Sequence, residues 1–269
     1  LAYLTRTFPI RQIASAQAAI ETAKATRRDG VLPSRAALFA APLTDDVTLG
    51  SEPIPAEDMA PTLAARRQGE DLRPLEFAAE EVSEIARVIE TSGSSVDLDP
   101  VPEKRATRQG VISSAGEARA ITHFSCHGLL DNEHPELSGL VLEPEPGELS
   151  STFTASEILL AKIRSELTVL SACDTGHGKL VEGEGAIALT RSFLASGSRS
   201  VVASLWKVPD LATKELMKLF YSNLIEGDPR GEALRQAQLD LAKDPQFSHP
   251  ANWAAFSLTG AGGPVVNPG

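Results

Sequence analysis

The stretch LTVLSACDTG, residues Leu167–Gly176, is a continuous apolar run that ends in a cysteine, an acid and a glycine. A short apolar run bounded by turn residues is typical of a strand that is buried on both faces of a parallel sheet. We therefore expect a buried strand here, with Cys173 delivered to its carboxyl end.

A second stretch upstream has the same form. Residues Ala120–Gly128, AITHFSCHG, are an apolar run that breaks at a glycine, and His127 is the last side chain before the break. In open α/β sheets the carboxyl ends of neighbouring strands border the crevice where ligands bind. His127 and Cys173 are therefore predicted to meet there, where an imidazole would supply the base or counter-charge that a thiol needs to react as thiolate.

The composition predicts a globular chain and restricts its partners. The 269 residues are 42% hydrophobic, which is enough to bury a large core. A net charge of −11 and a pI near 5.0 argue against a nucleic-acid surface and against an anionic membrane. The only two cysteines, Cys126 and Cys173, predict no disulfide framework and favour a reducing, cytoplasmic setting.

No targeting or membrane segment is expected. The sequence has no apolar run of about 20 residues that would span a membrane, and Arg6 and Pro9 interrupt the N-terminal stretch where a signal peptide would lie. The first residue is Leu1, and we interpret the chain as a piece of a longer polypeptide.

Strand and helix patterns alternate along the rest of the chain. This alternation predicts an α/β fold, a mostly parallel sheet of about six strands with helices on both faces. We expect an N-terminal helical linker over residues 1–34, an exposed insertion over 42–74, a main domain over 35–262 and a tail over 263–269. Strands are predicted at 35–42, 95–98, 120–127, 167–173, 200–206 and 253–258, and helices at 16–23, 80–90, 107–115, 186–196 and from Ile158, Asp210 and Asp228-Pro229 onward. Thr154–Glu157 predicts a capping box before Ile158, and Asp210 and Asp228 are expected to be the N-caps of their helices.

Several common binding motifs do not fit. The Gly176–Gly185 loop follows a strand and precedes a helix, but Val181 stands where a dinucleotide fingerprint needs its third glycine. A phosphate-binding loop would need glycine in place of Cys173, and a Gly-x-Ser-x-Gly nucleophile elbow is absent. The histidines and cysteines match no usual zinc spacing. We therefore predict neither a metal nor a cofactor.

Six collinear motifs make the sequence similar to a known family. They resemble the CHAT domain, a branch of the caspase-like cysteine peptidases of clan CD. The resemblance runs from about Arg35 to about Gly262. The motifs are Cys126-His127-Gly128, Ser171–Gly176, Gly183-Glu184-Gly185, Ser204–Val208, Ala233–Gln238 and Trp253–Phe256.

The resemblance implies a cysteine endopeptidase that works through a thioester. Cys173 would attack the scissile carbonyl, and His127 would protonate the leaving amine and later activate water. The backbone N–H groups of Gly128 and Cys173 would form the oxyanion hole. The resemblance further implies that a tetratricopeptide or other sensor region precedes the domain. It also implies a peptide-binding edge at Ser204, Leu205 and Trp206. Asp131, Asp174 and Asp210, near the strand ends, could form a pocket for a basic side chain, as in several caspase-like relatives, or could be solvated loop acids.

Other interpretations stay open. Cys173 could be a small buried hydrophobe, and Asp174 could orient the site or cap a turn. Cys126 is expected inside a strand, pointing away from His127. His123 is expected in the core, and His134, His177 and His249 in exposed loops. At the level of function, the alternatives are a catalytically silent caspase-fold signalling module and a small-molecule-binding domain that uses the Gly176–Gly185 loop.

Overall fold

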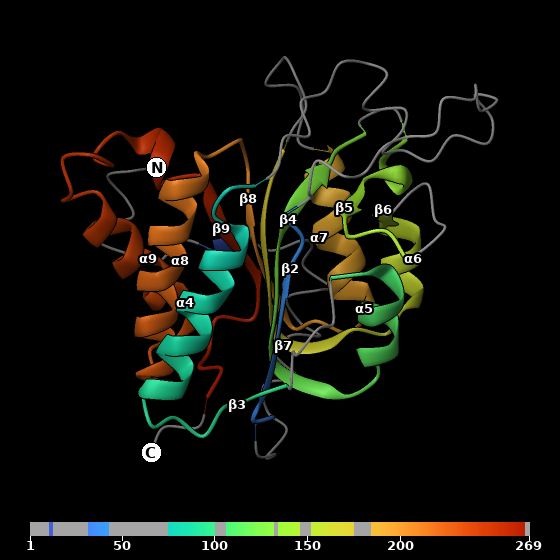
Figure 1. Ribbon diagram of the computed structural model, residues 1–269, viewed down its shortest axis with the longest axis horizontal. Coiled ribbons are helices and arrows are strands. Elements are labelled where there is room, and N and C mark those ends of the chain that lie inside the picture. The colour runs from blue at the N-terminus through green and yellow to red at the C-terminus, as the bar shows by residue number, and fades with distance from the viewer. Residues whose placement is uncertain are drawn as a thin grey trace.

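The structure is a computed structural model that describes residues 11–12, 32–42, 75–99, 106–131, 134–145, 152–174 and 184–266. For residues 11–12, 172–174 and 184–186 it describes the backbone alone. A central sheet lies between two layers of helices (Figure 1). One layer holds α4 (Ala78–Thr91), α8 (Asp210–Ile225) and α9 (Arg230–Leu241), and the other holds α5 (Arg108–Ser114), α6 (Ala155–Leu160) and α7 (Glu184–Ser196).

The sheet confirms the predicted fold class. Strands β2, β4, β7 and β8 are parallel neighbours, and β9 runs antiparallel to β8 at one side. Within the described residues the sheet has nine strands rather than about six, because several are only two or three residues long, too short for a periodic pattern to reveal. The order is β1-β9-β8-β7-β4-β2-β3, with β5 paired to β4 and β6 to β5. The bounds are β1 Arg11–Gln12, β2 Arg35–Ala40, β3 Asp97–Leu98, β4 Ala118–Leu129, β5 Gly139–Val141, β6 Thr152–Thr154, β7 Arg164–Asp174, β8 Ser200–Ser204 and β9 Phe256–Gly260.

Each face of the sheet has its own core. Successive side chains of a strand point to opposite faces, so β4 sends Ile121 to the α4, α8 and α9 side and Phe124 to the α5, α6 and α7 side. In β7, Val169 points to the α4, α8 and α9 side and Leu170 points to the α5, α6 and α7 side. Burial on both faces explains why these two strands read as continuous apolar runs in the sequence.

The helix boundaries follow the sequence signals, with two corrections. The predicted capping box opens α6, with Thr154 accepting the Glu157 N–H and Glu157 accepting the Thr154 N–H. In contrast, Asp210 does not cap α8: it is the first helical residue, Pro209 is the N-cap, and the Asp210 carboxylate accepts the N–H of Phe77 instead. The N-cap of α9 is likewise Pro229 and not Asp228.

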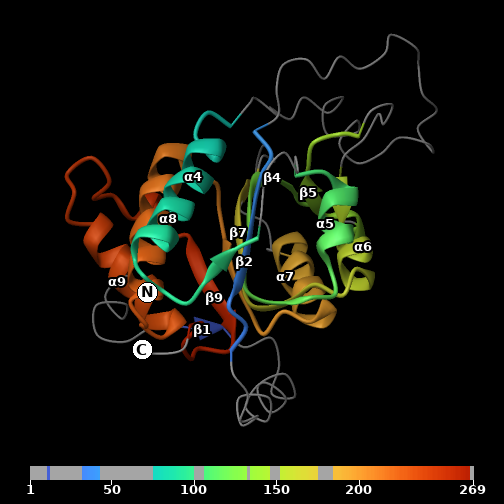
Figure 2. The same ribbon diagram turned by 60° about the horizontal axis from the view of Figure 1, so that its bottom comes forward.

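The two ends of the chain contribute to the fold. Within the segment predicted as a linker, Arg11–Gln12 pairs with Leu258 and Thr259 of β9 (Figure 2). Val265 and Val266, in the segment predicted as a tail, are buried in the core on the α8 side. The predicted helix at 16–23 and most of the predicted insertion at 42–74 lie outside the described residues. The last predicted strand begins at Phe256, because residues 250–252 form a 3-10 turn.

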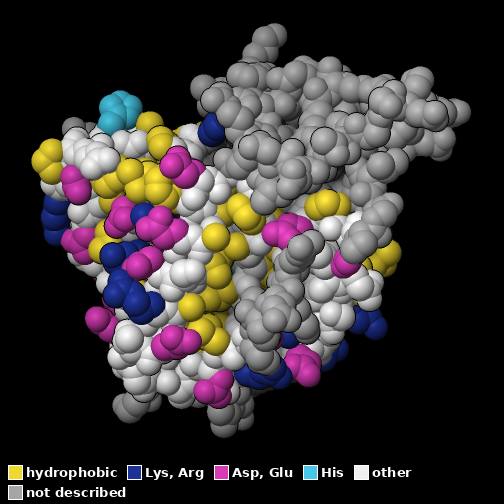
Figure 3. All heavy atoms as spheres, viewed as in Figure 1, with side chains coloured by type: hydrophobic (Ala, Val, Ile, Leu, Met, Phe, Trp, Pro, Cys, Tyr) yellow, Lys and Arg dark blue, Asp and Glu magenta, His cyan; other side chains and the backbone are white. Residues whose placement is uncertain are grey.

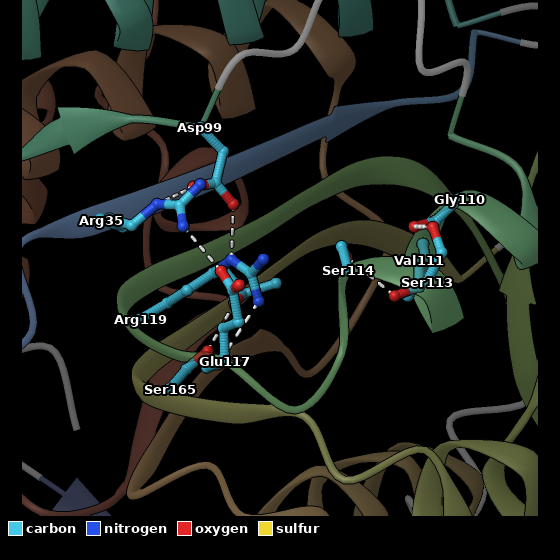
Figure 4. A network of polar contacts seen from close by, with 10 residues as sticks. Arg35, Asp99, Gly110, Val111, Ser113, Ser114, Glu117, Arg119 and Ser165 are labelled. Atoms are coloured by element: carbon cyan, nitrogen blue, oxygen red, sulfur yellow. Dashed lines mark hydrogen bonds and ion pairs between the residues drawn. The ribbon is translucent and has the colours of Figure 1, made fainter.

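A charged network joins the strands at the amino ends of β2 and β4 (Figure 4). Asp99 binds Arg35 through Oδ1 at 2.6 Å and Arg119 through Oδ2 at 2.7 Å, and Arg35 also binds Glu117 at 2.7 Å. These charges satisfy one another and lie at the end of the sheet opposite His127. We therefore assign them a structural role.

Acidic and basic side chains intermingle over the helical layer at the left of Figure 3, where Figure 1 places α4 and α8. Lys214 Nζ lies 2.9 Å from Glu80, and Arg87 lies 2.6 Å from Glu84. The acidic excess of the chain is therefore not gathered into a patch of one sign on this layer.

Candidate functional site

The carboxyl ends of β4 and β7 lie side by side in the sheet. The parallel register pairs His127 with Cys173 and Gly128 with Asp174. Backbones of neighbouring strands are about 4.8 Å apart, so the histidine and the cysteine predicted to act together stand opposite each other in adjacent strands. Strand β7 carries Cys173 near its carboxyl end, as predicted, whereas β4 does not break at Gly128: it continues to Leu129 because β5 pairs with this part of the strand.

A pocket of about 340 Å³ opens beside His127, which is itself 5% exposed. Its walls come from the ends of β4 and β7, from residues 207–209 and the first turn of α8, and from Leu75, three positions before α4. It is lined by Leu75, Cys126, His127, Ser171, Lys207, Val208, Pro209, Asp210 and Thr213. This volume exceeds that of any single amino-acid side chain, so one side chain of a peptide fits within it.

Ser171 contributes a polar atom to this pocket. Its side chain is 4% exposed, and its Oγ has no hydrogen-bond partner among the described residues. A buried hydroxyl without a partner costs free energy. A ligand would recover that cost only if a small movement of the pocket wall exposed the Ser171 hydroxyl to it.

Asp210 contributes the carboxylate of the pocket. Its Oδ2 accepts the Phe77 N–H at 2.8 Å. Burial raises the pKa of Asp210, and the nearby charges of Glu81 and Glu76 raise it further, while the Phe77 hydrogen bond acts in the opposite direction. Of the three acids predicted to form a pocket, Asp210 is the one that the structure places in its lining.

Of the other two acids, Asp131 is not among the described residues that line the pocket. Asp131 lies in the turn between β4 and β5, where its Oδ1 accepts the His134 N–H at 2.8 Å and its own N–H donates to Ser138 Oγ at 2.9 Å. Asp174 ends β7 opposite Gly128, and the structure describes its backbone only. Gly128 stands between β5 and β7, opposite Leu140 as well as Asp174.

The predicted peptide-binding edge lies at the end of β8. Ser204 pairs with Phe256, and the Leu205 N–H donates to the Ala255 carbonyl at 2.9 Å. Leu205 is 48% exposed, and Trp206 donates from Nε1 to the Ala251 carbonyl at 3.2 Å. These residues lie outside the pocket lining, and the chain that follows them enters the pocket at Lys207.

The remaining histidines and Cys126 lie where the sequence predicts them. His123 is 0% exposed and bonds to Tyr221 and Glu81, as expected of a core histidine. His134 and His249 are exposed. Cys126 is buried in the core on the α5, α6 and α7 side. His177 and residues 175–183 of the glycine loop lie outside the described residues.

Among the described residues, no group of histidines, cysteines and acids has the arrangement of a metal site. In the same part of the chain, no helix combines the length and the apolar character needed to span a membrane.

The sequence model of the CHAT domain family matches residues 1–261. The chain belongs to the CHAT domain family. The match begins upstream of Arg35, where we predicted the main domain to start, and it includes the segment that forms β1.

Relatives and solved structures are consistent with this assignment. This CHAT domain is 30% identical over 199 residues to tetratricopeptide repeat protein 28 of Mus musculus, covering 60% of the chain and 8% of that protein. It is 41% identical over 108 residues to the Homo sapiens protein of the same name, covering 40% of the chain and 4% of that protein. The chain therefore spans less than a tenth of either relative.

The fold is also that of a solved cysteine proteinase. The Arg-specific cysteine proteinase gingipain R superposes with a TM-score of 0.52 at 14% identity, covering 94% of this CHAT domain and 52% of that chain. At this identity the similarity establishes the fold alone. The CHAT domain thus has a caspase-like α/β fold.

Sequence reasoning missed part of the pocket of this CHAT domain. Leu75 and Thr213 line it but belong to none of the six motifs, and Val208 belongs to the Ser204–Val208 motif but was not assigned to the pocket. Ser171 had a usable signal, because it lies two positions before Cys173 in a strand whose side chains alternate between the faces of the sheet.

Proposed function

We propose that this CHAT domain is a cysteine endopeptidase that hydrolyses peptide bonds of a protein substrate with a dyad of Cys173 and His127. The observation that carries the proposal is the register of β4 and β7, which pairs these two residues at the strand ends beside a pocket. A silent signalling module would need neither a thiol opposite an imidazole nor a pocket next to them.

The reaction has two steps. The Cys173 thiolate adds to the scissile carbonyl, and the C–N bond breaks as His127 gives a proton to the leaving amine, which produces a thioester and a new amino terminus. His127 then takes a proton from water, which attacks the thioester and releases the carboxylate and the thiol. A histidine that is 5% exposed is shielded from bulk water, which favours such proton transfers.

The surroundings of the dyad suggest how a substrate is held. We assign the oxyanion hole to the backbone N–H groups of Gly128 and Cys173, where each donor is worth about 2.7–4 kcal/mol of barrier. An extended segment would lie along Ser204, Leu205 and Trp206 as an added strand. The Leu205 N–H already bonds to Ala255, so such a strand would have to use the backbone groups of its neighbours.

The pocket accommodates the side chain before the scissile bond, and we propose that this side chain is basic. Asp210 supplies the carboxylate and Ser171 an unpaired hydroxyl, while Leu75, Val208 and Pro209 offer apolar contact to a long aliphatic stem. Asp131 and Asp174, proposed earlier for the same pocket, are not needed for this role.

Regulation by an upstream region is part of the proposal. The two relatives are named as tetratricopeptide repeat proteins, and this chain corresponds to a small share of each. We propose that such a repeat region adjoins the domain in the cytoplasm and controls its activity. Equal activity of the domain alone and of the polypeptide with its upstream region would argue against this control.

Labelling with peptidyl electrophiles tests the proposed function. Reagents that differ only in the residue before the electrophile are incubated with the protein, and the adduct is located by intact mass and peptide mapping. We expect labelling at Cys173, loss of labelling in Cys173→Ala and His127→Ala, and a preference for arginine or lysine reagents. Absence of labelling from both the domain and the longer polypeptide would favour the silent signalling module.

A further inference from the structure

A fully buried polar cluster lies beneath the pocket, on the same face of the sheet. His123 Nδ1 is 3.0 Å from the Tyr221 hydroxyl, and His123 Nε2 is 2.9 Å from Glu81 Oε1. The exposed fractions are 0% for His123 and Tyr221 and 1% for Glu81. His123 belongs to β4, Tyr221 to α8 and Glu81 to α4, so a single imidazole joins three elements.

The tautomer of His123 sets the direction of the two hydrogen bonds. Burial, and then the charge of Glu81, raises the pKa of Tyr221 well above its ordinary value, so the phenol keeps its proton. In the Nε2–H tautomer of His123, the phenol donates to Nδ1 and Nε2–H donates to Glu81. Glu81 Oε2 has no partner among the described residues. A buried carboxylate with an unpartnered oxygen makes the folded state less stable than apolar packing at the same place would. Residues that lower stability in this way tend to occur at functional sites.

The same three elements meet again at the level of the pocket. The Phe77 N–H, just before α4, donates to Asp210 at the start of α8, and Asp210 lines the pocket with His127. Asp210 and Tyr221 are separated by roughly three turns of α8, about 16 Å. His123 and His127 span about 13 Å of β4. Helix α8 therefore runs along β4, with the pocket at one end of their shared length and the cluster at the other.

We propose that His123, held by Glu81 and Tyr221, is a positioning residue for the candidate site. It fixes the separation and tilt of α4 and α8 over β4, and through them the pocket walls around His127. Ion pairs of Lys214 with Glu80 and of Lys218 with Glu84 hold α4 and α8 to each other, and the two His123 bonds tie both helices to β4. The effect on catalysis rests on the proposed peptidase function, whereas the effect on geometry does not.

A matched pair of variants separates positioning from plain stability. Tyr221→Phe and Thr168→Val each delete one hydroxyl from a residue that is 0% exposed, and each leaves a buried partner, His123 or Ser198. In the full chain, at a temperature where both variants are folded, we expect Tyr221→Phe to lower kcat roughly tenfold and Thr168→Val to keep kcat within about twofold. Equal losses in the two variants, or no loss in either, would overturn the proposal.

A conservative substitution provides the rescue test. Glu81→Gln keeps an oxygen that accepts the His123 Nε2–H, and Glu81→Leu does not. We expect Glu81→Gln to retain several-fold more kcat than Glu81→Leu when KM is measured separately. The proposal is wrong if Glu81→Leu is as active as Glu81→Gln.

The His127 imidazole gives a readout that needs no turnover. Its side-chain NMR signals are expected to move in Tyr221→Phe and to stay in place in Thr168→Val. If the unaltered protein neither cleaves peptides nor is labelled at Cys173, the peptidase function is rejected, and the NMR comparison still decides the positioning role. Unmoved His127 signals in Tyr221→Phe reject the positioning role whatever the turnover.

Discussion

The carboxylate of Asp210 accepts the backbone N–H of Phe77 across 2.8 Å, and this bond joins the start of α8 to the start of α4. It occupies a carboxylate that would otherwise be available to accept the N–H groups at the start of α8. The bond forms one edge of the pocket, so its strength bears on both stability and the candidate site.

The raised pKa of Asp210 predicts a pH-dependent difference in stability. Because burial raises this pKa above the ordinary value of 3.8, the folded state binds the proton more tightly than the unfolded state. The contribution of Asp210 to the free energy of unfolding is therefore lost as pH rises from 3.8 through the pKa of this carboxyl in the folded state. Asparagine still accepts the Phe77 N–H, so Asp210→Asn should gain stability relative to the unaltered protein over that interval, as measured by urea unfolding between pH 3 and 7.

Asp240 provides the contrasting case. Burial acts to raise its pKa, but hydrogen bonds from Lys243 and Gln236 outweigh burial and lower it. Its contribution to stability is therefore present above the ordinary value of 3.8 and is lost as pH falls through the lower folded pKa. Asp240→Asn should lose stability relative to the unaltered protein as pH rises. If both variants gained stability relative to the unaltered protein as pH rises, or both lost it, at least one of the two pKa directions would be wrong.

Ser171→Ala should not destabilise the ligand-free protein. The serine hydroxyl is buried without a described partner, so its removal relieves a desolvation cost of about 1–3 kcal/mol less what the small cavity adds. We expect an unchanged or higher free energy of unfolding. Ser200→Ala is the matched control, since Ser200 Oγ donates to the Glu166 carbonyl at 2.7 Å and its loss should cost about 1 kcal/mol. Equal losses in the two variants would show that Ser171 has a partner.

Removing Glu166 from its ion pair with Arg230 should strongly destabilise the folded protein. Arg230 is 2% exposed and lies 2.8 Å from Glu166, which also binds Arg199 at 3.2 Å. Glu166→Leu leaves buried positive charge uncompensated and should cost about 3–5 kcal/mol. The double variant Glu166→Leu with Arg230→Met should recover much of that loss in chemical denaturation. A double variant as unstable as the single one would argue against charge as the cause.

Two glycines with positive φ should respond differently to alanine. At Gly260, φ is +101° and a Cβ would lie 2.5 Å from the Arg199 carbonyl oxygen, whereas at Gly93, φ is +68° and nothing lies within 4 Å of the added Cβ. Gly93→Ala should cost about 1 kcal/mol from backbone strain alone. Gly260→Ala must also displace backbone, and its Tm should fall further. Equal Tm values for the two variants would mean that the backbone around Arg199 moves away from the added Cβ at little cost in stability.

The sequence allowed His127, Cys173 and the pocket residue Asp210 to be predicted, but not the rest of the pocket lining. His127 and Cys173 could be placed together because each ends an apolar run, and parallel strands bring such ends to one edge. Asp210 was expected to cap α8, since a local pattern cannot show that the N–H of Phe77, distant in sequence, would take its carboxylate. Leu75 reaches the pocket only through tertiary packing, which no periodicity encodes.

The pairing of Arg11–Gln12 with β9 limits where the domain can be truncated at its N-terminal side. A fragment that starts at Arg35 would lack β1 and leave the outer backbone groups of Leu258 and Thr259 without their strand neighbour. An uncovered strand at the side of a sheet is a template for pairing with other chains. Such a fragment should therefore self-associate in a concentration-dependent way, and a boundary upstream of Arg11 should keep that side of the sheet closed.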